Sequence, residues 1–373
     1  MKVVAAIDSF KGSMTSMEAG NAVKKGILAA KPDAEVVVNP LADGGEGTVD
    51  ALIEGLGAKK IPVTVTGPLG EKVSCYYGFL EETKSAVMEM ASAAGITLVT
   101  KKDPLRASTY GVGEMIADAL KRGCKNFIIG IGGSATNDGG IGMLKALGFE
   151  FFDEDGNDVG EGAAALAKIE VIQTENKNPL LSGAKFQIAC DVKNPLCGKQ
   201  GATYIFGPQK GVTEEQKSKV DEAMKHYADV TKESLGCDFA DCEGAGAAGG
   251  LGYAFLSYLA GELIPGVELI LQATGLEEKM KNADVVVTGE GRLDAQTVMG
   301  KAPVGVAALA KKYNAKVIAF AGSVAPEASV CNQAGIDAFF PIVRGVTTLE
   351  EAMKKENAMK NIAATAEQVF RLL

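Results

Sequence analysis

The sequence predicts an α/β protein with two domains, one of which is a doubly wound parallel sheet built from both chain ends. Three observations support this prediction. Short β-branched runs alternate with longer stretches of helical period near the N-terminus. The same alternation returns after about residue 282. Between these regions the pattern changes to short, antiparallel-looking strands, which indicates a mixed α/β domain inserted into the first one.

The N-terminal elements follow a strand, helix, strand, helix order. Thr15 and Glu18 have the spacing of a capping box, so a helix is expected to start just after the first turn. That turn therefore lies at the positive end of a helix. The predicted elements are strands 3–7 and 35–38, a helix over 16–29 and a second helix from about Thr48.

The C-terminal elements repeat this order. The predicted elements are strands 284–288, 316–321 and 338–343, a helix over 304–312 and a helix from Thr348 onward. The strands are continuously apolar, which is typical of a parallel sheet covered by helices on both faces. We therefore expect the two chain ends to share one sheet.

The inserted domain has an organisation of its own. Thr213 and Gln216 offer a second capping box, at the start of an amphipathic helix. The other predicted elements are strands 62–66, 73–80, 86–90, 126–130 and 185–192 and a helix over 108–122. We place the boundaries near residues 66 and 282, so that 1–66 and 282–373 form the outer domain and 67–281 the inserted one.

The composition of the chain limits which classes of binding partner and which cellular location are expected. The chain has 47 acidic and 38 basic residues and a formal charge of −9, which argues against nucleic acid and anionic lipid as partners. The N-terminal apolar run ends at Asp8 and is too short for a signal peptide, so a cytoplasmic location is expected. The uncharged stretch 244–261 is rich in glycine and reads as a buried helix, not a membrane span. The oligomeric state stays open, a homo-oligomer included.

Four glycine-bearing turns follow apolar runs, and each carries an acidic residue; they span 8–12, 43–47, 132–140 and 289–294. Glycine allows backbone amides to approach an anion closely, whereas a carboxylate repels a bare anion. A phosphoryl donor that travels with Mg²⁺ needs both kinds of group. The four turns therefore favour phosphoryl transfer.

Other chemistries fit less well. No Walker A loop and no protein-kinase motif occurs in the sequence. A nicotinamide enzyme is an alternative, because residues 130–135 fit a dinucleotide-binding fingerprint and Glu150 lies twenty residues beyond the first glycine. Against it, Asp138 would face the pyrophosphate. The single histidine, His226, leaves acid-base work to carboxylates and lysines. A non-catalytic small-ligand-binding protein remains a further alternative.

The charged residues of the first, second and fourth turns are expected at one edge of the outer sheet, where open α/β sheets bind ligands. Arg292 suits a substrate carboxylate, because its planar fork can hold both oxygens. The alternatives are a backbone cap at Asp8 and an internal pair of Arg292 with Asp294. Asp191 is either a turn cap or a functional residue. The candidate catalytic residues are Asp8, Lys11, Asp43, Glu46, Asp191, Glu290, Arg292 and Asp294.

Taken in order, six segments of the chain resemble the bacterial type I glycerate kinase family, and the likeness spans the whole chain. The segments are 7–13 (Ile-Asp-Ser-Phe-Lys-Gly-Ser), 42–48 (Ala-Asp-Gly-Gly-Glu-Gly-Thr), 130–140 (Gly-Ile-Gly-Gly-Ser-Ala-Thr-Asn-Asp-Gly-Gly), 190–196 (Cys-Asp-Val-Lys-Asn-Pro-Leu), 206–211 (Phe-Gly-Pro-Gln-Lys-Gly) and 288–294 (Thr-Gly-Glu-Gly-Arg-Leu-Asp). Each segment alone is weak, but together they are specific.

The resemblance implies a flavodoxin-like, Rossmann-like domain formed from both chain ends, an inserted α/β domain and an active site in the cleft between them. It also implies that ATP with Mg²⁺ phosphorylates D-glycerate to 2-phosphoglycerate, with 3-phosphoglycerate as the alternative product. Asp138 or Asp191 are the candidate metal ligands. The residues expected to bind nucleotide phosphates are Gly132, Gly133, Ser134, Asn137, Asp138 and Lys210.

Overall fold

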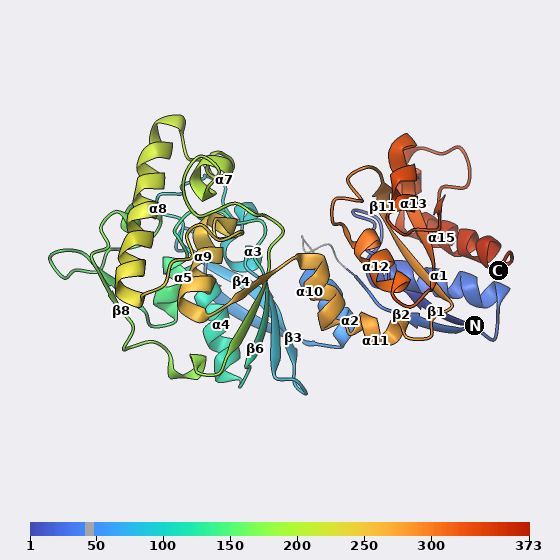
Figure 1. The fold of residues 1–373 in the computed structure, drawn as a ribbon, viewed down its shortest axis with the longest axis horizontal. Helices are drawn as coiled ribbons and strands as arrows, with labels where there is room; N and C mark the ends of the chain where they lie inside the picture. The colour runs from blue at the N-terminus through green and yellow to red at the C-terminus, as the bar shows by residue number, and fades with distance from the viewer. Residues whose placement is uncertain (42–47) are drawn as a thin grey trace. The chain divides into compact units, whose positions relative to one another are not determined.

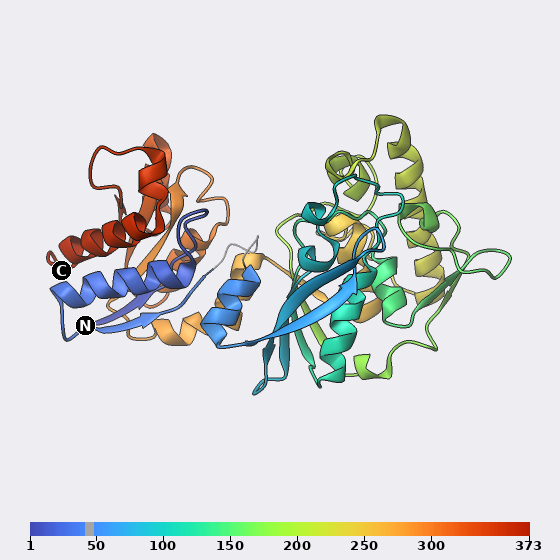
Figure 2. The same ribbon diagram turned by 180° about the vertical axis from the view of Figure 1, so that it is seen from behind.

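The computed structural model describes residues 1–41 and 48–373 and confirms the α/β fold class. The chain forms two compact units (Figures 1 and 2). The first unit contains residues 1–41, Asp50–Gly57 and Val267–Leu373, and the second contains Ala58–Gly266. The sequence-based boundary near 66 differs from the observed one, because strand β3 (Lys59–Thr66) pairs within the second unit's sheet. The boundary near 282 also differs, because the first unit already resumes at Val267.

The first unit is built on a five-stranded sheet in which all neighbouring strands are parallel. The order is β13-β12-β11-β1-β2, which is the 2-1-3-4-5 order of flavodoxin-like sheets when the strands of this unit are counted along the chain. The order reverses between β1 and β11. The strands are β1 (Lys2–Ala5), β2 (Glu35–Val38), β11 (Val285–Leu293), β12 (Lys316–Val324) and β13 (Ala338–Pro341).

Helices cover both faces of this sheet (Figures 1 and 2). α1 (Ser16–Ala30) and α15 (Lys355–Phe370) lie side by side on one face, where Val23 and Ile362 share a core with Phe320 of β12. α12 (Ala302–Lys311) packs against β11 and β12. The remaining helices are α2 (Thr48–Leu56), α10 (Gly266–Ala273), α11 (Leu276–Met280), the 3₁₀ helix Pro326–Ser329, α13 (Val330–Gln333) and α14 (Leu349–Met353).

Both predicted capping boxes are confirmed. The Glu18 amide donates to Thr15 Oγ1 (3.2 Å), and the Thr15 amide donates to Glu18 Oε2 (3.0 Å). The Thr213 amide donates to Gln216 Oε1 (3.0 Å) at the start of α8 (Glu214–Leu235). These reciprocal bonds satisfy amides that have no partner within their own helix.

The fourth predicted glycine turn is wrong. β11 does not end at Thr288 but continues to Leu293, so Glu290 and Arg292 lie within a strand. The glycines are there because β12 approaches closely: a Cβ on Gly289 would lie 2.1 Å from the Phe320 carbonyl oxygen. Glycine inside a strand can mark such close approach as well as a turn.

The second unit is built on a six-stranded mixed sheet of order β10-β9-β6-β5-β4-β3. β5, β6, β9 and β10 are parallel, whereas β3 and β4 add an antiparallel meander onto β5. The strands are β3 (Lys59–Thr66), β4 (Lys72–Leu80), β5 (Ser85–Glu89), β6 (Asn126–Gly130), β9 (Lys185–Ala189) and β10 (Glu262–Ile264), and β7 (Glu150–Phe152) pairs separately with β8 (Val171–Gln173).

The helices of the second unit enclose an aromatic core. Phe127 of β6 stacks on Phe186 of β9, with ring centroids 4.8 Å apart, and Phe255 packs on Phe186. The helices are α3 (Ala91–Ala94), α4 (Tyr110–Lys121), α5 (Ile141–Ala146), α6 (Ala163–Leu166), α7 (Ala202–Lys210), α8 and α9 (Ala247–Leu259), with 3₁₀ helices at Ile96–Leu98 and Pro179–Leu181. Together they cover the chemistry-bearing loops described below.

The stretch 244–261 contains the buried helix α9, as expected. Its glycines serve close approach: Gly249 has φ +70°, and a Cβ there would lie 2.2 Å from the Thr136 carbonyl oxygen. The start of α9 therefore presses directly on the loop that follows β6. Within the described part of the chain, no helix has the length and apolarity needed to cross a membrane.

Candidate active site

Asp8 lies just beyond β1, at the carboxyl edge of the first unit's sheet. Its side chain is buried, its amide donates to the Gly289 carbonyl (2.9 Å), and its Oδ1 accepts from the Ser9 amide (2.6 Å). The Ser9 bond is a backbone cap of the kind that Asp commonly makes in turns. Asp8 therefore orders the turn and also places a carboxylate at the sheet edge.

Lys11 lies at the tip of the tight turn between β1 and α1. Phe10 and Met14 exchange backbone hydrogen bonds of 3.0 and 3.1 Å across this turn, and Gly12 adopts φ +76°. Lys11 is exposed at the tip. The turn therefore presents an ammonium group at the edge that carries Asp8.

Glu290 lies on β11 and is almost fully buried. Its Oε1 accepts from Thr297 Oγ1 (2.6 Å), and Lys301 Nζ lies 3.6 Å from Oε2. Burial raises the pKa of Glu290, and the bonds from Thr297 and Lys301 oppose that rise. The Glu290 carboxylate is thus fixed by its bonds, and these bonds tie the segment 297–301 to β11.

Arg292 and Asp294 form the internal pair weighed in the sequence analysis, with Arg292 Nε 3.5 Å from Asp294 Oδ2. Asp294 Oδ1 also accepts from the Gln296 amide (2.9 Å). The Arg292 side chain is nevertheless 66% exposed, so most of its guanidinium donors face solvent. The pair orients Arg292 and leaves it able to meet an anion.

The structure brings Asp8, Lys11, Glu290, Arg292 and Asp294 to one edge of one sheet, because β1 and β11 are parallel neighbours. This edge lies at the point where the strand order reverses, which is where such sheets bind ligands. The two remaining predicted residues of this set, Asp43 and Glu46, lie outside the described residues.

A pocket of about 310 Å³ opens at this edge, and we call it the sheet-edge pocket. Its lining is formed by residues that follow β1, by residues of β11 and β12, and by the chain from β13 to α15. Its lining includes Phe10, Lys11, Gly291, Ile342, Leu349 and Asn361. Phe10, Lys11 and Gly291 belong to turns that the sequence pointed to. Ile342, Leu349 and Asn361 could not be predicted, because they lie far from those turns in the chain and show no common spacing with them.

The third glycine turn, 132–140, begins at the carboxyl end of β6 in the second unit. Gly132 and Gly133 are exposed, and Gly133 adopts φ +74°. The loop is held by its backbone: the Ile96 amide donates to the Gly133 carbonyl (2.8 Å), and Ser134, which is buried, bridges to Gly95. Of the predicted phosphate-binding residues, Gly132 and Gly133 are therefore the ones that lie at the surface of this loop.

Asp138 lies beneath that surface and is completely buried. It accepts from the Thr109 amide and hydroxyl (both 2.8 Å), the Gly140 amide (3.1 Å) and the Gly142 amide (3.3 Å). Burial raises the pKa of Asp138, and these bonds oppose the rise. The Gly140 and Gly142 amides at the start of α5 are thus bonded to Asp138, which leaves them unavailable to a phosphate.

Lys210 and Asn137 are also buried under the loop. Lys210 Nζ donates to the Thr136 carbonyl (2.7 Å), and Asn137 Nδ2 donates to Thr203 Oγ1 (3.0 Å). Burial lowers the pKa of Lys210 to about 7, and nearby Asp138 limits the fall. Lys210 therefore holds the loop from the inside.

This burial predicts a pH dependence of stability. The folded pKa of Lys210 is about 7 and its ordinary value is 10.5, so between these values the unfolded chain binds a proton that the folded chain lacks. The free energy of unfolding should therefore rise with pH in this range, by about 1 kcal/mol per pH unit from this one group. Urea unfolding of the wild type and Lys210→Met at pH 7 and 9 measures this. From pH 7 to pH 9 the free energy of unfolding should increase more for the wild type than for Lys210→Met. An equal increase in both proteins would show that the pKa of Lys210 is not lowered.

Asp191 follows β9, which ends at Ala189 and not at Val192 as predicted. The residue is exposed, and its Oδ1 accepts from the Gly266 amide (2.8 Å). Asp191 thus makes a capping bond, as the turn-cap alternative predicted, and the residue is also exposed to solvent. Among the residues that the structure describes, no group of three or more His, Cys, Asp or Glu side chains is placed to hold a metal ion.

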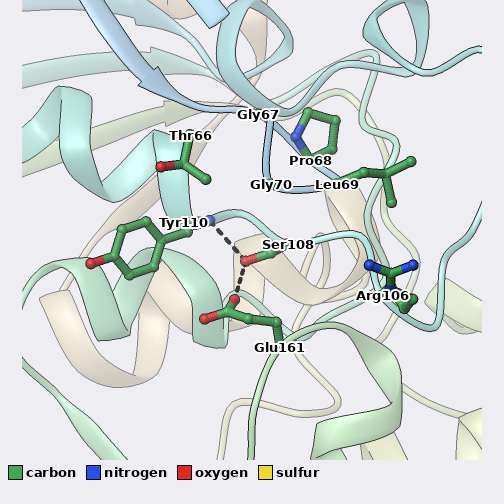
Figure 3. Close-up of a pocket in the computed structure, with 9 residues that line it drawn as sticks. All are labelled: Thr66, Gly67, Pro68, Leu69, Gly70, Arg106, Ser108, Tyr110 and Glu161. Carbon is green, nitrogen blue, oxygen red and sulfur yellow. Dashed lines mark hydrogen bonds between the residues drawn. The ribbon is translucent and has the colours of Figure 1, made fainter. Parts of the chain in front are cut away.

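A second pocket, of about 450 Å³, lies at the start of α4, and we call it the Arg106 pocket. Figure 3 shows the turn 67–70 bordering it and Ser108 bonded to Glu161 at its floor. Ser108 Oγ also accepts from the Tyr110 amide (3.1 Å). The Arg106 guanidinium has no hydrogen bond or ion pair with the described residues. The sequence analysis did not predict this site; its signal was the Gly-Pro-Leu-Gly turn at 67–70.

Comparison with known proteins identifies the family. A sequence model of the glycerate kinase family matches residues 3–373. The chain belongs to the glycerate kinase family. Kinases of this family are phosphotransferases, so the chain is an enzyme, and the predicted family and enzyme class are confirmed. The comparisons support neither the nicotinamide nor the non-catalytic alternative.

Curated relatives and a solved structure agree with the family match. The chain is 45% identical to a glycerate kinase of Bacillus subtilis over 99% of this chain and 97% of the relative. It is 46% identical to a glycerate 2-kinase of Escherichia coli over 98% of both. A crystal structure of a protein assigned as glycerate kinase 2 from Salmonella typhimurium LT2 superposes with a TM-score of 0.91 at 43% identity, over 99% of this chain and 97% of that one.

Proposed function

We propose that this glycerate kinase transfers the γ-phosphoryl group of ATP, bound with Mg²⁺, to the 2-hydroxyl of D-glycerate. The observation that carries the proposal is the match to the Escherichia coli glycerate 2-kinase at 46% identity over 98% of both chains. The charged edge of the first unit and the glycine loop of the second unit supply the groups that such a reaction needs.

The charged edge supplies groups for the acceptor. Arg292 is oriented by Asp294 and still exposed, so it suits the glycerate carboxylate. Lys11 adds an exposed point charge for a phosphoryl oxygen. Asp294 or Asp8 accepts the hydroxyl proton late in the transfer, when the phosphoryl group is already leaving its donor. We propose Asp43 and Glu46 for this acceptor site as well, because they belong to the glycine turn that follows the second strand in the sequence.

The second unit supplies groups for the phosphates of the donor. The exposed backbone at Gly132 and Gly133 suits phosphate oxygens, and Ser134 follows directly. Asp138, Asn137 and Lys210 are buried, so we propose that they shape this loop from beneath.

Mg²⁺ commonly takes one or two carboxylates together with phosphate oxygens and water. Asp191 fits that donor set better than Asp138, because Asp191 is exposed whereas the Asp138 carboxylate accepts four internal bonds. Bound Mg²⁺ would offset charge on the phosphate oxygens. Asp191 would supply one oxygen to that ion.

A coupled assay of ADP formation tests the proposal. ATP and Mg²⁺ are supplied with D-glycerate, with L-glycerate or with no acceptor. We expect ADP formation that depends on D-glycerate and on Mg²⁺, with little activity in the other two reactions. An equal rate with and without D-glycerate would overturn the proposal, because the enzyme would then not use this acceptor.

A further inference from the structure

The sheet-edge pocket has the wrong chemistry for glycerate. D-glycerate carries a carboxylate and two hydroxyls on three carbons and has no apolar face. The pocket is instead lined largely by apolar side chains, including Phe10, Ile342, Val343, Leu349 and Met353. An apolar pocket with a few polar groups is typical of sites for flat organic ligands. Its main occupant must therefore be more apolar than the acceptor.

Two glycines of neighbouring strands line the pocket with backbone alone. Gly291 of β11 and Gly322 of β12 both line it. A Cβ on Gly322 would lie 2.5 Å from the Gly291 carbonyl oxygen, so no larger residue fits. The bare backbone of two neighbouring strands is thus open to a planar ring, and Phe10 borders the same space.

Two large apolar side chains at the rim of the pocket are exposed to solvent. Leu349 is 76% exposed and Met353 is 38% exposed, and both line the pocket from α14. Clustered exposed apolar side chains commonly mark a binding site, because a ligand that covers them removes apolar surface from water.

Asn361 contributes a side-chain amide to the pocket, whose other polar lining residues are Lys11, Ser13, Ser323, Thr347 and Thr348. It lies on α15, and its side-chain amide makes no hydrogen bond with the described residues. An amide can donate with its NH₂ and accept with its oxygen at the same time, which matches the N7 acceptor and N6 amino donor of adenine. Guanine offers two acceptors at the corresponding edge, so the amide oxygen would face an acceptor.

Resting on the proposed use of ATP, we propose that the sheet-edge pocket binds the adenine base of the nucleotide and that Asn361 selects adenine over guanine. The base lies over Gly291 and Gly322, within the apolar wall. Lys11 borders the same pocket, so its ammonium group can meet the phosphates that follow the base. The volume of about 310 Å³ suits a nucleoside and leaves the phosphates outside.

The substitution Asn361→Asp tests the proposal. A carboxylate accepts but cannot donate, so it keeps an acceptor for the N6 amino group of adenine, loses the bond to N7 and places a negative charge against that acceptor. We expect the KM for ATP to rise about tenfold and the KM for D-glycerate to stay within about twofold. The KM for GTP should not fall, because guanine presents only the N7 and O6 acceptors to the new carboxylate. Gln368→Glu is the matched control, because it makes the same amide-to-acid change at an exposed site of α15 outside the pocket.

Calorimetric titration with ADP and GDP separates this proposal from the proposed function. If the wild type binds ADP more tightly than GDP, and Asn361→Asp weakens ADP binding whereas Gln368→Glu does not, the pocket assignment stands even where D-glycerate is not phosphorylated. If the wild type phosphorylates D-glycerate and both variants keep its ADP affinity and ATP KM, the pocket assignment is wrong and the kinase function stands. Thermal melting shows whether each variant is folded.

Discussion

Replacing Asp138 with alanine is expected to lower the free energy of unfolding by about 3–5 kcal/mol. The carboxylate is completely buried and accepts four hydrogen bonds, from Thr109 twice and from the Gly140 and Gly142 amides. Its removal leaves these buried donors without this acceptor, and buried donors that lack a partner destabilise the folded state. It also removes the charge that faces Lys210.

Urea unfolding measures this loss, and Asp158→Ala provides the control. Asp158 lies in the same unit and pairs with Lys145 at 2.7 Å, but its side chain is 53% exposed. Exposed pairs contribute about 1 kcal/mol or less, so the control should unfold close to the wild type. A variant at Asp138 as stable as the control would show that the carboxylate does not hold the glycine loop.

Replacing Asp294 with asparagine is expected to lower kcat by about 10²–10⁴-fold, the usual contribution of a general base. Asparagine keeps the size of the side chain and the oxygen that accepts from the Gln296 amide. It loses the charge that orients Arg292 at 3.5 Å and the ability to take a proton. The stability should therefore change by less than about 1 kcal/mol.

Asp284→Asn is the matched control for this activity loss. Asp284 precedes β11 at the opposite end, where its carboxylate accepts from the Lys2 amide (2.7 Å). Steady-state kinetics of the control should resemble the wild type. A variant at Asp294 that melts early but retains kcat would show that Asp294 is only a structural cap.

Much of the fold was predictable because local signals agreed with the tertiary structure. Continuous apolar runs gave strands such as β2 and β6 at their observed bounds, and the Thr15 capping box marked the start of α1. The error at β11 had a physical cause. A glycine that makes room for a neighbouring backbone, such as Gly289 beside Phe320, has the same sequence signature as a glycine that turns the chain.

The candidate site was predictable in part, for a similar reason. Asp8 and Arg292 could be placed together because parallel strands end at a common edge. The direction of Asp138 could not be predicted, since the same glycine loop could expose that carboxylate or bury it against Thr109. Asn361 and Phe10 line the same pocket only as a result of tertiary packing, and no local spacing in the sequence indicates this.

The phosphorus NMR spectrum of the reaction product, recorded with proton coupling, tests the central claim most directly. Phosphate on the 2-oxygen of glycerate is coupled to a single methine proton, whereas phosphate on the 3-oxygen is coupled to a methylene pair. Incubation of the enzyme with ATP, Mg²⁺ and D-glycerate should produce a phosphomonoester doublet together with ADP. A triplet would show phosphorylation at the 3-hydroxyl, and the absence of any new phosphomonoester would contradict the D-glycerate kinase function.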